Sequence, residues 1–405
     1  MKTKKIALVT EAYWPLKGGV EEAVRQLAAH LPAQFQCTVY THHLYKHPVS
    51  LFRRYGCIEP QKEIKTDPAG KKIVIIRPSL FRKAALFPLL LWGVPLLRRG
   101  STAPKLFDFL FIFYRYAYKK MLKRYLAGYD LVHCYATGYI ARCAQEVCKE
   151  HGVPIVQLPS IHFGRWGDSP RQMEAYTKSD AVIALSSKSA EDFRNRATNL
   201  RTPIKVIPPV ISKACCPTME VKPLEGRFIL FLGRRETHKG VGELLNAYMQ
   251  ITTDVKLVLS GPGEKIPKNA ESERVIDMGE VCEGTKIWLL ANCDFLCVPS
   301  RDETFGIVFA EAMSYGKPVV STDIEPINEI VVNNHCGLLV PPADTSSLKD
   351  ALEKMLFDDE ATMRMGKNAL DRFDKLYSPD VTVGAIAELY GELIEGSGYT
   401  RRCPN

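Results

Sequence analysis

Short apolar runs alternate with amphipathic stretches along most of the chain. The runs of the first half that are typical of buried strands lie at residues 5–10, 37–42, 71–78, 130–135, 154–160 and 181–186. Helical patterns, such as residues 20–31 and 138–151, lie between several of them. Strands that alternate with helices in this way predict a parallel sheet covered by helices.

The same rhythm begins again in the second half. Its predicted strands lie at residues 227–234, 255–263, 274–279, 286–293, 294–300 and 317–323, with a helical pattern at 240–251. A proline-rich stretch with little pattern, residues 206–226, joins the two halves. We therefore predict an α/β protein with two Rossmann-like, doubly wound parallel-sheet domains, at residues 1–208 and 209–378. The amphipathic helix predicted at 379–395 packs back on the first domain.

The composition is that of an ordinary soluble globular protein. The 405 residues are 46% hydrophobic and 24% charged, and the length suits two domains. The 12 cysteines show no CxxC or zinc-ligand spacing, which indicates free thiols in a reducing cytosol. The first apolar run spans only four residues before Thr10, too short for the core of a signal peptide. We therefore expect a cytoplasmic location.

Charge is unevenly distributed along the chain. Residues 1–130 hold 23 Lys and Arg against 8 Asp and Glu, whereas the remainder holds 31 against 37. This asymmetry suggests that the first part meets an anionic partner, and a solvated basic face is the alternative. No nucleic-acid-binding motif is visible, so we expect no nucleic-acid partner.

Residues 79–128 mix bulky apolar and aromatic side chains with many lysines and arginines. Prolines, a glycine and charges interrupt the apolar runs, so none supplies the ~20 residues of a membrane-spanning helix. One interpretation is an interfacial segment on the anionic inner face of a membrane, which would make the protein peripheral. The other is a pair of core helices whose exposed face is basic. The sequence favours neither.

Four polar signals follow predicted strands of the second half, at the edge where open α/β sheets bind ligands. The first is GRRETHKG, whose Arg234 and Lys239 suit a diphosphate. The second is SGPGE, where Gly261 lets the backbone approach a ligand closely, and the third is MGEV, which ends at Val281. For each of these three signals, an ordinary loop or turn is the alternative.

The fourth signal, ETFGIVFAE, places carboxylates at Glu303 and Glu311. A helix starting near Gly306 would leave the amides of Phe305 and Gly306 free to donate to an anion, helped by the helix dipole. Eight residues cover roughly 12 Å at most, about the distance from a sugar to a ribose across a diphosphate. Glu303 would accept from sugar hydroxyls and Glu311 from ribose hydroxyls. Alternatively, Glu303 only complements the dipole and Glu311 faces solvent.

Together these residues resemble the retaining GT-B glycosyltransferases of family 4, most strongly from Phe228 to Pro341. The resemblance implies two domains facing a central cleft, with the acceptor on the first and the nucleotide sugar on the second. Near the start, PLKGGVEEAVRQLA matches the family's glycine loop, PIVQLPSIHFG its active-site histidine, and YDLVHCY the strand before it, which contributes His133. The donor-binding residues implied are Gly18, Gly19, Arg234, Lys239, Gly261, Val281, Glu303, Thr304, Phe305, Gly306, Ile307 and Glu311. The catalytic residues implied are His162, Glu303, Arg234 and Lys239.

The resemblance implies transfer of a sugar from a UDP- or GDP-sugar to an acceptor hydroxyl, in cell-surface polysaccharide or glycolipid synthesis. It implies no metal and no cofactor, with a sugar or lipid-linked acceptor. The acceptor proton would pass to the leaving phosphate, and His162 would polarise or position the sugar. Three departures are IPPVIS at 207–212, Glu325-Pro326 for a Gly-Gly pair, and Cys134 for a second histidine. Two rivals remain: a nucleotide-sugar 2-epimerase-like isomerase, and a catalytically silent sugar-nucleotide-binding protein.

Overall fold

The computed structural model divides the chain into two compact units. The residues that it describes are 3–13, 18–43, 61–66, 72–77, 115, 118–137, 139–159, 161, 167–197, 200–213, 224–263 and 273–400. Unit 1 comprises Met1–Leu185, Ser189–Ile207 and Val383–Asn405, and unit 2 comprises Ser186–Lys188 and Pro208–Thr382. The division after Ile207 lies one residue from the boundary that the sequence predicts.

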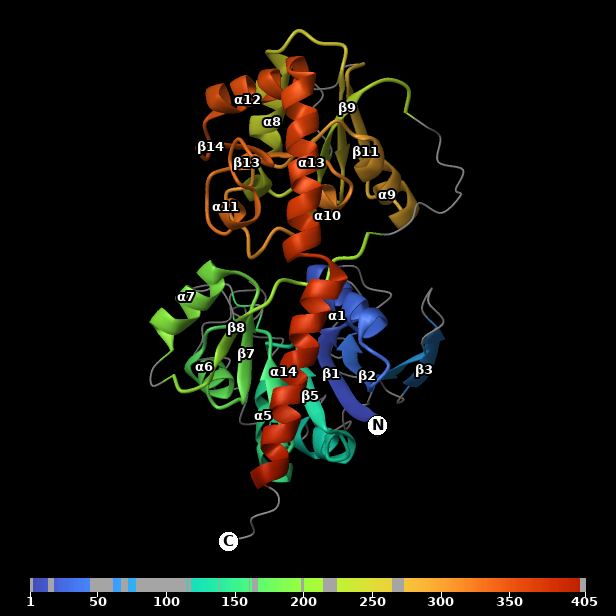
Figure 1. The fold of residues 1–405 in the computed structure, drawn as a ribbon, viewed down its shortest axis with the longest axis vertical. Helices are drawn as coiled ribbons and strands as arrows, with labels where there is room; N and C mark the ends of the chain where they lie inside the picture. The colour runs from blue at the N-terminus through green and yellow to red at the C-terminus, as the bar shows by residue number, and fades with distance from the viewer. Residues whose placement is uncertain are drawn as a thin grey trace, which may run out of the picture. The chain divides into compact units, whose positions relative to one another are not determined.

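Unit 1 is built on an eight-stranded sheet with the order β3-β4-β2-β1-β5-β6-β7-β8 (Figure 1). The strands are β1 (Lys4–Ala12), β2 (Phe35–His43), β3 (Gln61–Thr66), β4 (Lys72–Arg77), β5 (Leu131–Cys134), β6 (Ile155–Gln157), β7 (Ala181–Ala184) and β8 (Ile204–Val206). Every pairing is parallel except that of β3 with β4. Strands β5 and β7 are buried along their whole length, as in a sheet covered on both faces.

Five labelled helices belong wholly or mainly to unit 1. They are α1 (Gly19–His30), α5 (Tyr139–His151), α6 (Pro170–Thr177), α7 (Ser187–Arg196) and α14 (Pro379–Thr400), the last of which joins unit 1 from Val383. Tyr390 of α14 is fully buried, its ring packs edge-on against Phe35 with centroids 5.6 Å apart, and its hydroxyl lies 2.7 Å from Nδ1 of His133. Helix α14 therefore contributes to the first unit's core.

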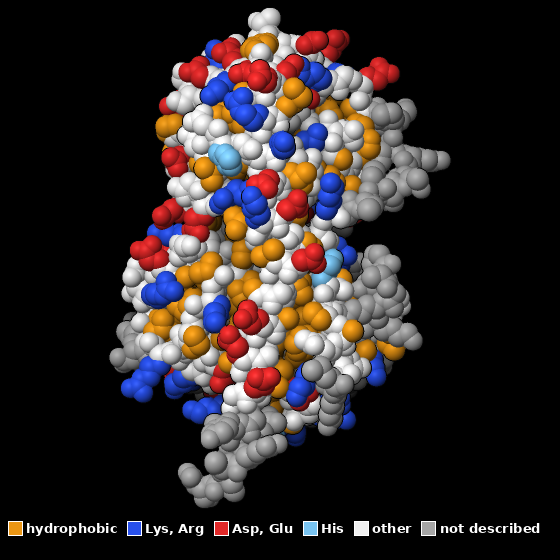
Figure 2. Space-filling view, viewed as in Figure 1, with side chains coloured by type: hydrophobic (Ala, Val, Ile, Leu, Met, Phe, Trp, Pro, Cys, Tyr) orange, Lys and Arg blue, Asp and Glu red, His pale blue; other side chains and the backbone are white. Residues whose placement is uncertain are grey.

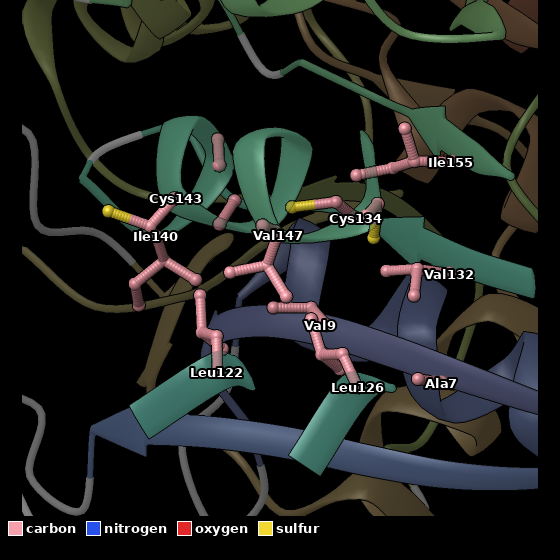
Figure 3. Packing of buried hydrophobic residues seen from close by; sticks show 14 of the residues in the cluster. Ala7, Val9, Leu122, Leu126, Val132, Cys134, Ile140, Cys143, Val147 and Ile155 are labelled. Atoms are coloured by element: carbon pink, nitrogen blue, oxygen red, sulfur yellow. The ribbon is translucent and has the colours of Figure 1, made fainter. Parts of the chain in front are cut away.

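Residues 118–126 form a further helix of unit 1, inside the segment with two interpretations. Its side chains Leu122 and Leu126 point into a core cluster with Val9 of β1 and Val147 of α5 (Figure 3). Tyr118 in the same helix is also fully buried. The apolar face of this part therefore packs against protein and is not available to enter lipid. Residues 78–114 and 116–117 lie outside the described residues.

The basic face of helix 118–126 is partly neutralised by acidic side chains of α5. Lys119 forms ion pairs with Glu146 and Glu150, the first at 3.4 Å. Arg115 lies 2.8 Å from Glu146, and Lys123 lies 3.9 Å from Glu150. Across the face drawn in Figure 2, blue and red side chains are likewise intermingled. Ion pairs within the fold thus neutralise part of the positive charge of residues 1–130.

Unit 2 is a second Rossmann-like layer structure. Its sheet is parallel throughout and has the order β11-β10-β9-β12-β13-β14, the order 3-2-1-4-5-6 in chain terms. The strands are β9 (Phe228–Leu232), β10 (Lys256–Ser260), β11 (Val275–Gly279), β12 (Leu296–Cys297), β13 (Val319–Thr322) and β14 (Gly337–Val340). The helices are η2 (Thr237–Lys239), α8 (Val241–Met249), α9 (Glu283–Asn292), α10 (Ile307–Ser314), α11 (Ile327–Ile330), α12 (Thr345–Phe357) and α13 (Asp359–Leu376).

The prediction of two doubly wound α/β units is confirmed, but three strands were missed. The run at 286–293, expected as a strand, belongs to helix α9 and its C-cap residue, because a short apolar run does not distinguish a buried helix from a strand. Strand β3 reads QKEIKT, and its Ile64 is 61% exposed, so it lacks the apolar run of a buried strand. Strands β8 and β14 are short edge strands of three and four residues. In the described parts, eight cysteines are free thiols. No helix among the described residues is long and apolar enough to cross a membrane.

Candidate functional site

Three neighbouring strand ends of unit 2 are joined by main-chain hydrogen bonds. Gly233 N–H, after β9, donates to Ser260 O at 3.0 Å, and Gly261 N–H, after β10, donates to Gly279 O at 2.7 Å. Gly261 has φ +137°, and a Cβ there would lie 1.9 Å from Gly233 O. The approach of a neighbouring strand end therefore requires glycine at 261, a structural reason that sequence reasoning did not identify.

A buried ion pair fastens the same strand ends. Arg235, only 4% exposed, forms a bidentate pair with Asp277 of β11, with Nη1 2.6 Å from Oδ2. Asp277 Oδ1 also accepts from Gly279 N–H at 2.9 Å. Sequence reasoning singled out Arg234 instead, whose side chain is 65% exposed and lies 2.7 Å from Glu236. In a sequence of 405 residues, no local signal connects Arg235 with a carboxylate 42 positions away.

The loop after β9 also packs against the loop after β12. Gly240 has φ +73°, and a Cβ there would lie 2.2 Å from Pro299 O. Arg301 N–H donates to His238 O at 2.7 Å, and the Ser300 hydroxyl donates to the same oxygen at 3.3 Å. These contacts hold η2 against residues 299–303, which brings together two side chains 64 positions apart in sequence.

Those two side chains are Lys239 and Glu303. Lys239 Nζ lies 2.5 Å from Glu303 Oε1, and the side chains are 14% and 10% exposed. An ammonium has three N–H donors, so this bond does not exhaust what Lys239 can bind. The structure thus joins two residues that the sequence nominated separately, and the remaining N–H donors of the ammonium are those that an anion could accept from.

Helix α10 begins where the fourth signal predicts. Gly306 is its N-cap residue, with φ +89°, and a Cβ there would lie 2.5 Å from the ring of Phe309. The Phe305 side chain is 4% exposed and packs edge-on against Tyr377, with ring centroids 6.0 Å apart. Buried aromatic packing and a glycine-only conformation therefore set the direction of the helix start, whose first N–H groups have no partner within the helix.

Glu311 lies on the second turn of α10 and is 17% exposed. Its Oε1 is 2.6 Å from Nζ of Lys286, a residue of α9 that sequence reasoning missed. The alternative in which Glu311 merely faces solvent is therefore wrong. The remaining donor-site candidates of unit 2 are all partly exposed: Val281 between β11 and α9, Thr304 before the helix start and Ile307 at its first position.

The site candidates of unit 1 have a different environment. Gly18 is the extended N-cap residue of α1 and Gly19 its first helical residue, both exposed. His133, at 0% exposure, is bonded to Tyr390, and burial lowers its pKa from 6.5 to about 3. A neutral imidazole bonded within the core indicates a structural role. His162 lies outside the described residues, and its predicted role stays a prediction.

No group of three or more His, Cys, Asp or Glu side chains that could hold a metal ion occurs within the part of the chain that the structure describes. Two lysines, Lys239 of η2 and Lys286 of α9, are each paired with a glutamate, Glu303 before α10 and Glu311 within it. Whether the reaction needs a metal therefore stays a prediction from the sequence.

Comparison with known proteins places the chain among enzymes of one class. The model "Glycosyltransferase Family 4" matches residues 17–214, and "Glycosyl transferases group 1" matches residues 218–372. The chain is 32% identical over 177 residues to phosphatidyl-myo-inositol mannosyltransferase of Mycobacterium leprae, covering 41% of this chain and 47% of that protein. The match thus spans about half the length of that relative.

A longer match is to the α-D-kanosaminyltransferase of Streptomyces kanamyceticus, 25% identical over 311 residues, covering 68% of this chain and 80% of the relative. Among solved structures, Anabaena Alr3699/HepE in complex with UDP and glucose is similar with a TM-score of 0.68 and 18% identity, covering 96% of this chain and all of that chain. The fold is therefore GT-B. The two matched models together span most of both units, so the chain is a glycosyltransferase made of a family 4 domain followed by a group 1 domain.

Proposed function

We propose that the protein moves a sugar from a nucleoside-diphosphate sugar to an acceptor hydroxyl, with retention of the anomeric configuration. The observation that carries this proposal is the Lys239–Glu303 pair, 2.5 Å apart beside the start of α10, with Glu311 on the second turn of that helix. Family membership supports glycosyl transfer, and the similar Anabaena protein was solved with UDP and glucose.

Each group has a role in this proposal. Glu303 accepts from hydroxyls of the transferred sugar, and Glu311 accepts from the ribose. Lys239, together with Arg234 and the N–H groups at the α10 start, stabilises the diphosphate as negative charge develops on it. The acceptor proton passes to the leaving phosphate on the same face of the sugar, and His162 polarises or positions the sugar. No side chain acts as a covalent nucleophile, and no metal is required.

A binding panel tests the donor assignment. UDP, GDP and their sugars are titrated into the wild-type protein and into Glu303→Gln, with binding measured by calorimetry. Glu353→Gln is the matched control, because Glu353 is also paired with a lysine, at 3.0 Å, on helix α12 of the same unit. The proposal expects the Glu303 variant to lose affinity for a nucleotide sugar while the control binds like wild type. Equal binding by all three proteins would contradict it.

Turnover separates transfer from its rivals. A transferase releases the nucleoside diphosphate in proportion to acceptor glycosylated, whereas a 2-epimerase converts the donor when no acceptor is present. A silent binding protein does neither. NMR of the anomeric proton in the product then reports retention or inversion. Donor conversion without acceptor, or an inverted product, would refute the corresponding part of the proposal.

We further propose a sugar or lipid-linked acceptor at the cytoplasmic surface of a membrane, in cell-surface polysaccharide or glycolipid synthesis. The name of the mycobacterial relative, a phosphatidyl-myo-inositol mannosyltransferase, supports this, as do the exposed basic residues Lys120, Lys123 and Arg124. Flotation with anionic liposomes tests it with those three residues changed to glutamine. Binding that survives the change would count against electrostatic attachment through helix 118–126.

A further inference from the structure

Helices α9 and α10 are joined by an ion pair that involves a predicted ribose ligand. Lys286 Nζ lies 2.6 Å from Glu311 Oε1 and 3.4 Å from Glu283 Oε1. Lys286 and Glu311 are 22% and 17% exposed, whereas Glu283 is 52% exposed. The bond to Glu311 is thus both the shorter and the more sheltered of the two, and it is the stronger constraint on where each side chain lies.

This pair answers an electrostatic problem of the proposed site. A carboxylate close to a diphosphate repels it, and the repulsion grows where water is partly excluded. A lysine on the flank of Glu311 offsets that charge and restricts the rotamers of the glutamate. A carboxylate has about four lone-pair sites on its two oxygens, so a bond at Oε1 does not exhaust its capacity to accept from hydroxyls.

We infer that Lys286 is a positioning residue for the nucleotide, acting through Glu311 by holding that carboxylate ready to accept from the ribose hydroxyls. The inference rests on the proposed function and adds to it a residue of another helix, outside the two-glutamate motif. A purely structural alternative exists, in which the pair only fastens α9 to α10. The two differ in one respect: a structural pair does not sense whether the ribose carries hydroxyls.

Calorimetric titration with UDP, GDP and their 2′,3′-dideoxy counterparts distinguishes the two. The proteins compared are wild type, Lys286→Met, Lys286→Arg, Glu311→Gln and the Lys286→Met/Glu311→Gln double variant. Glu283→Gln is the matched control, since it removes the longer, exposed partner of the same lysine. Thermal unfolding of each variant, without ligand, reports whether the fold is kept.

The wild type is expected to bind the ribose nucleotide more tightly than the dideoxy nucleotide. Lys286→Met is expected to weaken the ribose nucleotide about tenfold while leaving the dideoxy nucleotide little changed, which removes the discrimination. The double variant should bind no more weakly than Glu311→Gln alone, because both changes remove one interaction. Lys286→Arg should restore part of the affinity, and Glu283→Gln should bind like wild type.

The results that would refute this inference differ from those that would refute the proposed function. If wild type binds UDP or GDP and Lys286→Met keeps full discrimination, the role of Lys286 is refuted while the donor site stands. Equal weakening of ribose and dideoxy nucleotides also refutes it, in favour of a structural pair. If Lys286→Met does not fold, Lys286→Gln decides by the same discrimination, because it removes the charge and keeps a polar side chain. A wild type that binds neither nucleotide overturns both proposals.

Discussion

Replacing Lys239 with methionine is the most informative perturbation of the site, because it separates stability from chemistry. The change leaves the Glu303 carboxylate, 10% exposed, without its partner at 2.5 Å. Breaking a fully buried pair costs roughly 3–5 kcal/mol. Exposed pairs are worth about 0.2–1 kcal/mol. The side chains of Lys239 and Glu303 are 14% and 10% exposed, so the cost of breaking their pair should lie between these two ranges. We therefore expect unit 2 to lose about 2 kcal/mol of unfolding free energy.

Scanning calorimetry measures that loss. For a unit of 150–250 residues, each kcal/mol lowers the melting temperature by about 2–4 °C, so the expected shift is about 4–8 °C. The Lys239→Met/Glu303→Gln double variant removes the orphaned charge, and it should recover most of the lost stability. Neither variant should recover turnover, because the cation at the diphosphate is absent from both, at a cost of about 10²–10³-fold.

Two results would refute this reasoning. If Lys239→Met has the same melting temperature as wild type, the Lys239–Glu303 pair does not contribute the expected stability to unit 2. If the double variant recovers turnover as well as stability, Lys239 serves only to neutralise Glu303. Glu353→Gln, in the more exposed pair on α12, is the control, and it should change neither quantity appreciably.

Three further predictions concern the supports of the two units. Gly261→Ala should destabilise unit 2 by ~3 kcal/mol in urea unfolding, because its Cβ would lie 1.9 Å from Gly233 O at φ +137°. Arg235→Met should lower the free energy of unfolding of unit 2 by about 3 kcal/mol and weaken nucleotide binding. The same change at a fully solvated arginine should alter neither quantity. His133 has a folded pKa of about 3 against 6.5, so below pH 6.5 the unfolded chain binds its proton and stability falls towards pH 3. The slope is at most about 1.4 kcal/mol per pH unit, and a His133→Asn variant should show a shallower fall in unfolding free energy from pH 6.5 to 4.5.

The architecture could be predicted because buried parallel strands leave continuous apolar runs. Strand β9, FILFL, is buried throughout, and such a run is legible without any alignment. The edge strands were harder to recognise. Strand β3 is polar, with Ile64 61% exposed, so burial imposes no pattern on it. Its antiparallel pairing with β4 extends the sheet beyond the plain doubly wound order.

The site could be predicted only as far as local signals reach. The helix start at Gly306 and the ligand-binding roles of Glu303 and Glu311 were predicted from one short stretch. The structure confirms the helix start. The lysine partners of the glutamates could not be predicted from local signals. Lys286, for example, is 25 residues before Glu311 and on a different helix. Gly261 shows a second limit of the sequence. Glycine is required there because the backbone of Gly233 lies close. The sequence alone does not distinguish this from a glycine that makes room for a ligand.

The most direct measurement is a crystal structure of the protein with the nucleoside diphosphate that it binds best. The account predicts the ribose hydroxyls within hydrogen-bonding distance of the Glu311 carboxylate, and the phosphates beside Lys239 and the first amides of α10. A nucleotide bound elsewhere on the molecule, or bound here with its ribose turned away from Glu311, would contradict it.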